Sequence, residues 1–200
     1  PGTDRPCEPA HPVDPPLILS VGIQLPRKGH DVLLKGLAGI TDLNWQVKIV
    51  GAPLDAAYAQ ELETLRLSLG LADRVTLKGQ IGHDELGELY RAASVFALAT
   101  RFEGYGMVFD EALVHGLPII SCAAGAVPDT VPTDAGLLVP PDAPEAFADA
   151  LRQVLSDPDA CQTLATAAQT AGHALPSWQD TGAIAATALA AVTKEKAPAS

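Results

Sequence analysis

Two glutamates in the segment TRFEGYGMVFDEALVHGLPII, residues 100–120, stand eight positions apart around a glycine-rich turn. The turn contains Gly104 and Gly106 and precedes an apolar segment of helical spacing, which we expect to begin near Met107. Backbone N–H groups at the start of a helix are unpaired and lie at the positive end of its dipole, so they attract an anion such as a diphosphate. The glycines would let that anion approach the backbone closely.

The glutamates themselves, Glu103 and Glu111, need a different partner, because carboxylates repel phosphates. A carboxylate can accept hydrogen bonds from both hydroxyls of a vicinal sugar diol. We therefore expect Glu111, inside the helix, to face a ribose diol. Glu103, in the loop, would face a second sugar beyond the phosphates.

A second loop, GIQLPRKGH at residues 22–30, carries the complementary charge. It places Arg27 beside Lys28 in a chain that has only 13 Lys and Arg against 24 Asp and Glu. These two cations would neutralise the same diphosphate from its other side, and most strongly as charge develops on a departing nucleotide. The two loops together predict a binding site for a nucleoside diphosphate sugar.

The elements that must position these loops are read from hydrophobic periodicity. Short β-rich runs alternate with helical patterns, which is typical of βαβ units and of a parallel sheet with helices on both faces. The predicted strands are PLILSVG, WQVKIVG, RVTLKG, SVFALAT, PIISCA and GLLVP. The predicted fold is a doubly wound α/β domain of about six strands, Rossmann-like, with a helical C-terminal extension. Such sheets bind ligands at the carboxyl ends of the strands, near the point where strand order reverses, and the two loops follow two of these strands.

Three parts of the chain are expected. Residues 1–16 contain six prolines and are predicted to be an interdomain linker, which implies a further domain upstream. Residues 17–176 would form the nucleotide-sugar-binding domain, and residues 177–200 a C-terminal helix with a frayed tail. Helices follow one another from residue 142 onward, with predicted N-caps at Asp142, Asp157 and Ser177.

Composition limits the function classes. With 48% apolar residues and a mean hydropathy of +0.17, the chain is typical of a globular protein. A net charge of −11 argues against a nucleic-acid partner. The three cysteines, Cys7, Cys122 and Cys161, form neither a metal-ligand pair nor a disulfide framework, which favours a reducing, cytoplasmic setting. The longest apolar runs are about half the length that spans a bilayer, and the five histidines show no metal spacing, so no metal is expected.

Other nucleotide-binding classes fit less well. A nicotinamide-binding domain should carry Gly-x-Gly-x-x-Gly in its first βα turn, where this chain has GIQLPRKG. A P-loop protein should carry Gly-Lys-Ser/Thr after a glycine-rich loop, and this chain does not. A non-catalytic sugar-nucleotide-binding or regulatory module stays open as an alternative to an enzyme.

The segments SVGIQLPRKGHDVLL, RFEGYGMVFDEALVHGLPII and GAVPDTVPTDAGLLVPP together resemble the nucleotide-sugar-binding C-terminal domain of group 1 retaining glycosyltransferases of GT-B architecture, which has two Rossmann-like domains. The resemblance runs from about residue 17 to 155, and more loosely to Trp178. Its most specific element is the pair Glu103 and Glu111, with seven residues between them.

The resemblance implies roles for individual residues. Lys28 would contact the diphosphate and Glu103 the donor sugar, and these two residues together with Arg27 are the expected catalytic residues. Glu111 would bind the ribose. The remaining substrate-binding positions are Gly22 of the first loop and the backbone that cradles the diphosphate, at Gly104, Tyr105, Gly106, Met107 and Val108.

Two departures from the family pattern leave the donor open. Many members have arginine where this chain has Ile23, so the second cation is either missing or supplied by Arg27. The segment that often reads Gly-Gly-x-Pro-Glu is AGAVPD here, with Ala124 for the first glycine and Asp129 for the glutamate.

The resemblance further implies a retaining, metal-independent transfer of a hexose from a UDP-, GDP- or ADP-sugar. A missing N-terminal domain would hold the acceptor, which could be a carbohydrate, a lipid or a small molecule, so this chain alone is expected to be inactive. The implied location is cytoplasmic, and attachment at the inner membrane surface through the missing domain stays open.

Overall fold

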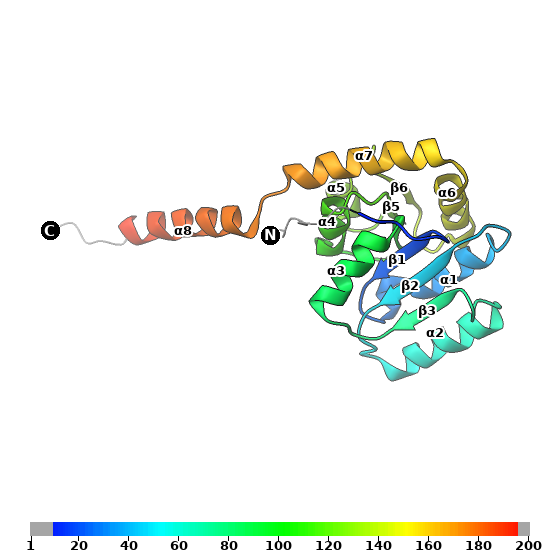
Figure 1. The fold of residues 1–200 in the computed structure, drawn as a ribbon. Helices are drawn as coiled ribbons and strands as arrows, with labels where there is room; N and C mark the ends of the chain where they lie inside the picture. Colours follow the sequence, from blue (N-terminus) through cyan, green and yellow to red (C-terminus); the bar gives the residue numbers. More distant parts are fainter. Residues whose placement is uncertain (1–9, 196–200) are drawn as a thin grey trace.

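The computed structural model describes residues 10–195, with side chains as far as residue 187, and shows one parallel sheet covered by helices on both faces (Figure 1). The predicted doubly wound α/β fold of six strands is confirmed. The strands are β1 (Leu17–Val21), β2 (Gln46–Val50), β3 (Val75–Lys78), β4 (Val95–Leu98), β5 (Ile119–Cys122) and β6 (Gly136–Val139). Their order, β3-β2-β1-β4-β5-β6, reverses between β1 and β4.

The helices connect the strands and continue after the last one. They are α1 (His30–Ala38), α2 (Ala56–Ser68), α3 (His83–Ala92), α4 (Met107–Val114), α5 (Val127–Thr130), α6 (Pro144–Ser156), α7 (Pro158–Ala174) and α8 (Trp178–Glu195). The sequence did not predict α5 or the 3₁₀ helix η1 (Pro26–Lys28). Both are very short and carry a proline in the first turn, so they offer too little periodicity to be recognised.

Two apolar cores lie on opposite faces of the sheet. One contains side chains from α1, α2 and α6, and the other contains side chains from α3, α4 and α7. Adjacent strand residues alternate between them, so that Ile18 belongs to the first core and Leu19 to the second. Burial on both faces explains why the strands are nearly continuous apolar runs.

Two of the three predicted helix caps are confirmed. The Asp157 carboxylate accepts hydrogen bonds from the N–H groups of Asp159 (3.1 Å) and Ala160 (3.0 Å) at the start of α7. The Ser177 hydroxyl accepts from the Asp180 N–H (3.1 Å) at the start of α8. The prediction for Asp142 was wrong: α6 begins after Ala143 without a side-chain cap, and Asp142 adopts φ 56° with its side chain turned to an arginine described below.

The last helix, α8, points away from the body of the domain (Figure 1), and its Trp178 and Ile184 side chains are 52% and 67% exposed. Among residues 10–195 no helix is both long and apolar enough to cross a bilayer. The first nine residues of the predicted linker and residues 196–200 of the predicted tail, KEKAPAS, lie outside the described residues. The limits predicted for the domain, 17 and 176, stay a prediction.

Candidate functional site

The two loops singled out by the sequence meet where the strand order reverses. The first loop, residues 22–29, follows β1, and the second loop, residues 99–106, follows β4. Their backbones are joined, because the Arg101 N–H donates to the Arg27 carbonyl oxygen (2.8 Å) and the Thr100 hydroxyl donates to the same oxygen (3.1 Å). The fold thus places the two loops at the position where doubly wound sheets bind ligands.

Lys28 and Glu103 form a buried ion pair between the two loops. The Lys28 Nζ contacts Glu103 Oε1 across 75 positions of sequence, and the residues are only 7% and 5% exposed. Two charges withdrawn from water persist only when each has a partner. The sequence placed both residues in the site but assigned them to different parts of a ligand, and the structure shows that they also contact each other.

Glu103 is held from both ends. Its Oε1 lies 3.4 Å from the Thr100 hydroxyl, and its carbonyl oxygen accepts from the Ala126 N–H (3.0 Å). Gly125 stands directly against this backbone with φ 58°, and a Cβ there would lie 2.2 Å from the Glu103 carbonyl oxygen. The AGAVPD segment therefore requires a glycine at 125 whatever stands at 124.

Arg101, the neighbour of these residues, ties four segments together. Its guanidinium donates to both carboxylate oxygens of Asp31 on α1 (2.9 Å each) and through Nε to Asp142 before α6 (2.7 Å). It also donates to the Pro26 carbonyl oxygen in the first loop. Burial alone would raise the pKa of Asp31, but the hydrogen bonds from Arg101 outweigh it and lower that pKa. Arg101 therefore holds the first loop, α1 and the approach to α6 against the second loop.

Helix α4 begins at Met107, where the sequence predicted a helix start. Gly106 is its N-cap at φ 83°, no side chain caps the helix, and a Cβ on Gly106 would lie 2.6 Å from the Phe109 ring. Tyr105 and Met107 are 42% and 53% exposed. The Tyr105 carbonyl oxygen accepts from the Thr130 hydroxyl (2.9 Å), which fixes the turn from outside.

Glu111 lies on α4 in a different environment. Its Oε2 accepts a hydrogen bond from the Tyr90 hydroxyl (2.8 Å), and its carbonyl oxygen accepts from His115 Nδ1 (2.8 Å). Burial raises the pKa of Glu111, while the Tyr90 hydrogen bond and the charge of His83 act to lower it. The two glutamates of the motif are thus stabilised by different groups, one by an ammonium and one by a phenol.

The other residues predicted for the first loop have distinct positions. Gly22 leaves room for the lysine stem, since a Cβ there would lie 3.2 Å from Lys28 Cδ. Its carbonyl oxygen accepts from His30 Nε2 (3.1 Å), and burial lowers the pKa of His30 to about 4, so this imidazole is neutral. Arg27 is exposed at the surface of the loop.

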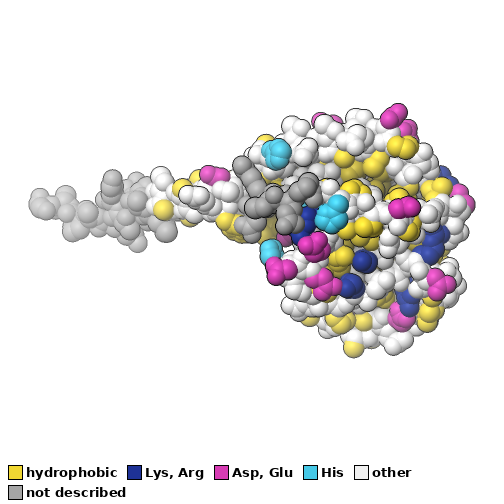
Figure 2. Space-filling view, in the orientation of Figure 1, with side chains coloured by type: hydrophobic (Ala, Val, Ile, Leu, Met, Phe, Trp, Pro, Cys, Tyr) yellow, Lys and Arg dark blue, Asp and Glu magenta, His cyan; other side chains and the backbone are white. Residues whose placement is uncertain are grey.

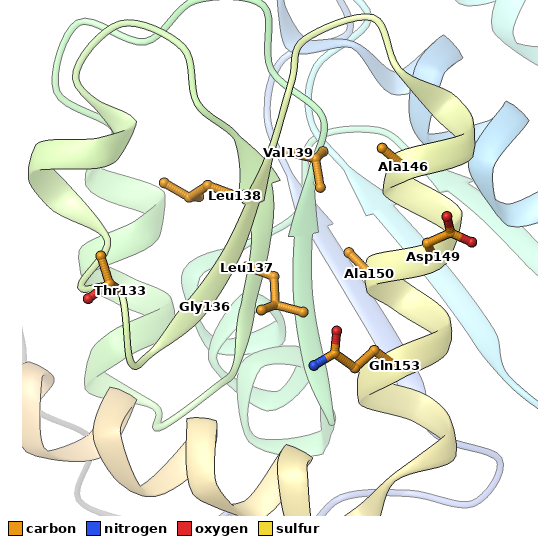
Figure 3. A pocket seen from close by; sticks show the side chains of 9 residues that line it. All are labelled: Thr133, Gly136, Leu137, Leu138, Val139, Ala146, Asp149, Ala150 and Gln153. Carbon is orange, nitrogen blue, oxygen red and sulfur yellow. The ribbon is translucent and has the colours of Figure 1, made fainter.

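Two further observations concern the rest of the surface. A hollow of about 470 Å³ lies between β6 and α6, with Leu137 and Val139 turned toward the helix and Leu138 turned away (Figure 3). None of the predicted site residues lines this hollow. On the face shown in Figure 2, Lys and Arg side chains lie among Asp and Glu side chains instead of forming a continuous cationic surface.

Among the side chains described, those of residues 10–187, no three His, Cys, Asp or Glu are grouped so that they could hold a metal ion. Sequence reasoning missed three residues that build the site: Thr100, Arg101 and Tyr90. Thr100 and Arg101 stand three and two positions before Glu103, so their closeness to the motif could have marked them as site residues. Tyr90 lies 21 positions before Glu111 on another helix, so only the tertiary structure, which places α3 and α4 over the same core, relates them.

Comparisons with a family profile and with individual proteins point to the same family. The profile described as Glycosyl transferases group 1 matches residues 5–171. A D-inositol 3-phosphate glycosyltransferase from Xylanimonas cellulosilytica is 33% identical over 186 residues, which cover 92% of this chain and 44% of that protein.

Solved structures show the same fold. Sucrose-phosphate synthase from Thermosynechococcus elongatus superimposes with a TM-score of 0.79 at 35% identity, over 90% of this chain and 47% of that one. HepE from Anabaena, solved in complex with UDP-glucose, superimposes with a TM-score of 0.79 at 24% identity, over 87% of this chain and 48% of that one. The chain thus spans less than half the length of each of these proteins. It belongs to the group 1 glycosyltransferase family and matches the C-terminal part of these GT-B proteins.

Proposed function

We propose that this chain is the donor-binding half of a retaining glycosyltransferase, which moves a hexose from a nucleoside diphosphate sugar to an acceptor without a metal ion. One observation carries the proposal: Lys28 and Glu103, from loops 75 positions apart, meet at the carboxyl ends of β1 and β4, where the strand order reverses. A cation, a carboxylate and the uncapped start of α4 gather there. HepE, a protein of the same fold, was solved with UDP-glucose.

In this proposal the backbone of residues 104–108 and Lys28 hold the diphosphate, and the exposed Arg27 adds charge from the rim. An ammonium group has three donors, so Lys28 can keep its bond to Glu103 and still donate to a phosphate oxygen. Glu103 would then accept from the donor hexose and Glu111 from the ribose. The base would lie near residues 78–82, largely against backbone.

The reaction we propose is front-face departure of the diphosphate, so that the acceptor attaches on the same face of the sugar. Lys28 and the amides at the start of α4 stabilise the charge that develops on the leaving group. The leaving phosphate takes the proton of the acceptor hydroxyl. The acceptor would be bound by a domain outside this chain. The proposed location of the reaction is the cytoplasm.

Calorimetric titration with UDP, GDP, ADP and their hexose conjugates, with NAD as control, tests the donor site. One diphosphate family should bind, and Glu111→Ala should weaken it by about 1–3 kcal/mol because two ribose hydroxyls lose their acceptor. Glu103→Gln should weaken the sugar conjugate more than the free diphosphate. Equal losses for both ligands would contradict the role of Glu103, and no binding by any of the three families to the folded chain would contradict the proposal.

A further inference from the structure

We propose that Tyr90 is a positioning residue that holds the Glu111 carboxylate in the orientation required by the ribose diol. The inference rests on the proposed function and adds a residue that the sequence motif does not contain. The observation behind it is the hydrogen bond from the Tyr90 hydroxyl to Glu111 Oε2 (2.8 Å), made between α3 and α4.

The Tyr90 ring has little freedom to move. It is 2% exposed and stacks on His115 with a centroid distance of 4.8 Å and an interplanar angle of 16°. It also stacks on Phe96 of β4 at 6.2 Å and 15°. His115 in turn donates through Nδ1 to the Glu111 carbonyl oxygen (2.8 Å). The phenol therefore reaches Glu111 from a ring that strand and helix hold in place.

The hydroxyl has one role that the ring lacks. The stacking contacts need only an aromatic ring, and a phenylalanine would supply them. The hydroxyl, in contrast, occupies one oxygen of Glu111 and leaves Oε1 to accept from a ligand. A carboxylate that is fixed before binding loses less side-chain entropy when the ligand arrives.

Burial is the largest influence on the ionisation of Glu111, and it raises the pKa of this carboxyl. Two groups besides Tyr90 also act on its carboxylate: His83 at the start of α3 favours the ionised form, whereas the neighbouring Asp110 opposes it. The Tyr90 phenol favours the ionised form through a direct hydrogen bond. The phenol therefore orients the acceptor and, through its hydrogen bond, acts against the burial that raises the pKa of Glu111.

Tyr90→Phe tests the inference, because it removes the hydroxyl and keeps the ring. The quantity to measure is the preference for ribose: the ratio of dissociation constants for the 2′,3′-dideoxy form and the ribo form of whichever diphosphate binds. This preference should fall about tenfold in Tyr90→Phe, the size of one hydrogen bond to a charged group. Glu111→Ala should abolish it.

Tyr58→Phe is the matched control. Tyr58 also donates from a helix to a carboxylate, Asp31 Oδ1 (3.0 Å), but in the core on the other face of the sheet. This variant should keep the full ribose preference. Thermal melts of both variants check that the fold survives.

A second readout does not depend on any ligand. Carboxyl NMR of the free chain should show that the pKa of Glu111 rises in Tyr90→Phe and does not change in Tyr58→Phe. An unchanged pKa, or an undiminished ribose preference in Tyr90→Phe while Glu111→Ala loses it, would overturn the inference and leave the proposed function standing. If none of the three diphosphates binds the wild-type chain, the proposed function fails, and the ribose role of Tyr90 fails with it.

Discussion

Glu103 and Glu111 belong to one sequence motif, yet different kinds of partner stabilise their carboxylates in the structure. Glu103 is 5% exposed, pairs with the ammonium of Lys28 and lies in a loop fixed by Thr100 and Ala126. Glu111 is half-buried on a helix, and its partner is a neutral phenol.

The difference has a physical consequence for each half of the site. In the Glu103 half, Lys28 already compensates the charge of Glu103 in the free protein, so the ion pair supports the folded state. Removing one partner leaves the other as a buried charge without a counter-ion. In the Glu111 half, burial opposes ionisation and raises the pKa of the carboxyl, so the ionised group costs the free protein stability. The Lys28–Glu103 pair therefore supports the folded state, whereas the ionised form of Glu111 lowers its stability.

The largest effect that distinguishes the halves should come from Lys28→Met. It leaves Glu103 buried without its cation, which should lower the free energy of unfolding by about 3–5 kcal/mol. The matched control is Lys78→Met, whose pair with Glu85 lies at the surface with side chains 30% and 49% exposed and should contribute about 0–1 kcal/mol. Urea denaturation measures both.

The double variant Lys28→Met/Glu103→Leu should recover much of that loss, because it removes both charges together. A single Lys28→Met variant as stable as the Lys78→Met control would contradict the assignment of the pair as a buried structural element.

The next effect concerns the backbone behind Glu103. Gly125→Ala combines a left-handed φ of 58° with a Cβ 2.2 Å from the Glu103 carbonyl oxygen, and should cost about 2–4 kcal/mol. Gly70→Ala is the matched control, because Gly70 has φ 70° but a Cβ added to it would meet no heavy atom within 4 Å, and it should cost only about 1–2 kcal/mol. Urea denaturation measures the loss of unfolding free energy in both variants. Equal losses would show that the backbone at Glu103 can shift to accept the added Cβ without an energetic cost.

The smallest effect has the opposite sign and lies in the Glu111 half. Since the folded-state pKa of Glu111 is raised, its contribution to stability is present at low pH and is lost as the pH rises through that pKa. Glu111→Gln should therefore match the wild type in acid and melt at a higher temperature at neutral pH, while it binds the nucleotide more weakly. Melting curves across pH test this, and a variant less stable than the wild type at neutral pH would contradict it.

Much of the fold was predictable because the spacing of apolar residues along the sequence indicates its strands and helices. All six strands and most helices follow from runs such as PLILSVG and from the spacing of leucines in α2, since a parallel sheet buried on both faces demands such runs. A helix cap was predictable where the capping side chain bonds only to nearby backbone, as Asp157 does at the start of α7. Asp142 misled the prediction because a distant arginine, Arg101, competes for its carboxylate.

The sequence by itself determined which residues are candidates for binding a nucleoside diphosphate sugar: a glycine turn before a helix, a glutamate on each side of that turn, and adjacent cations in another loop. These are properties of residue type and short spacing. Only the tertiary structure decided which groups the ligand-binding residues meet in the free protein. The partners Lys28–Glu103 and Tyr90–Glu111 are separated by 75 and 21 positions, and they come together because β1 and β4 are neighbours and α3 and α4 lie over the same core.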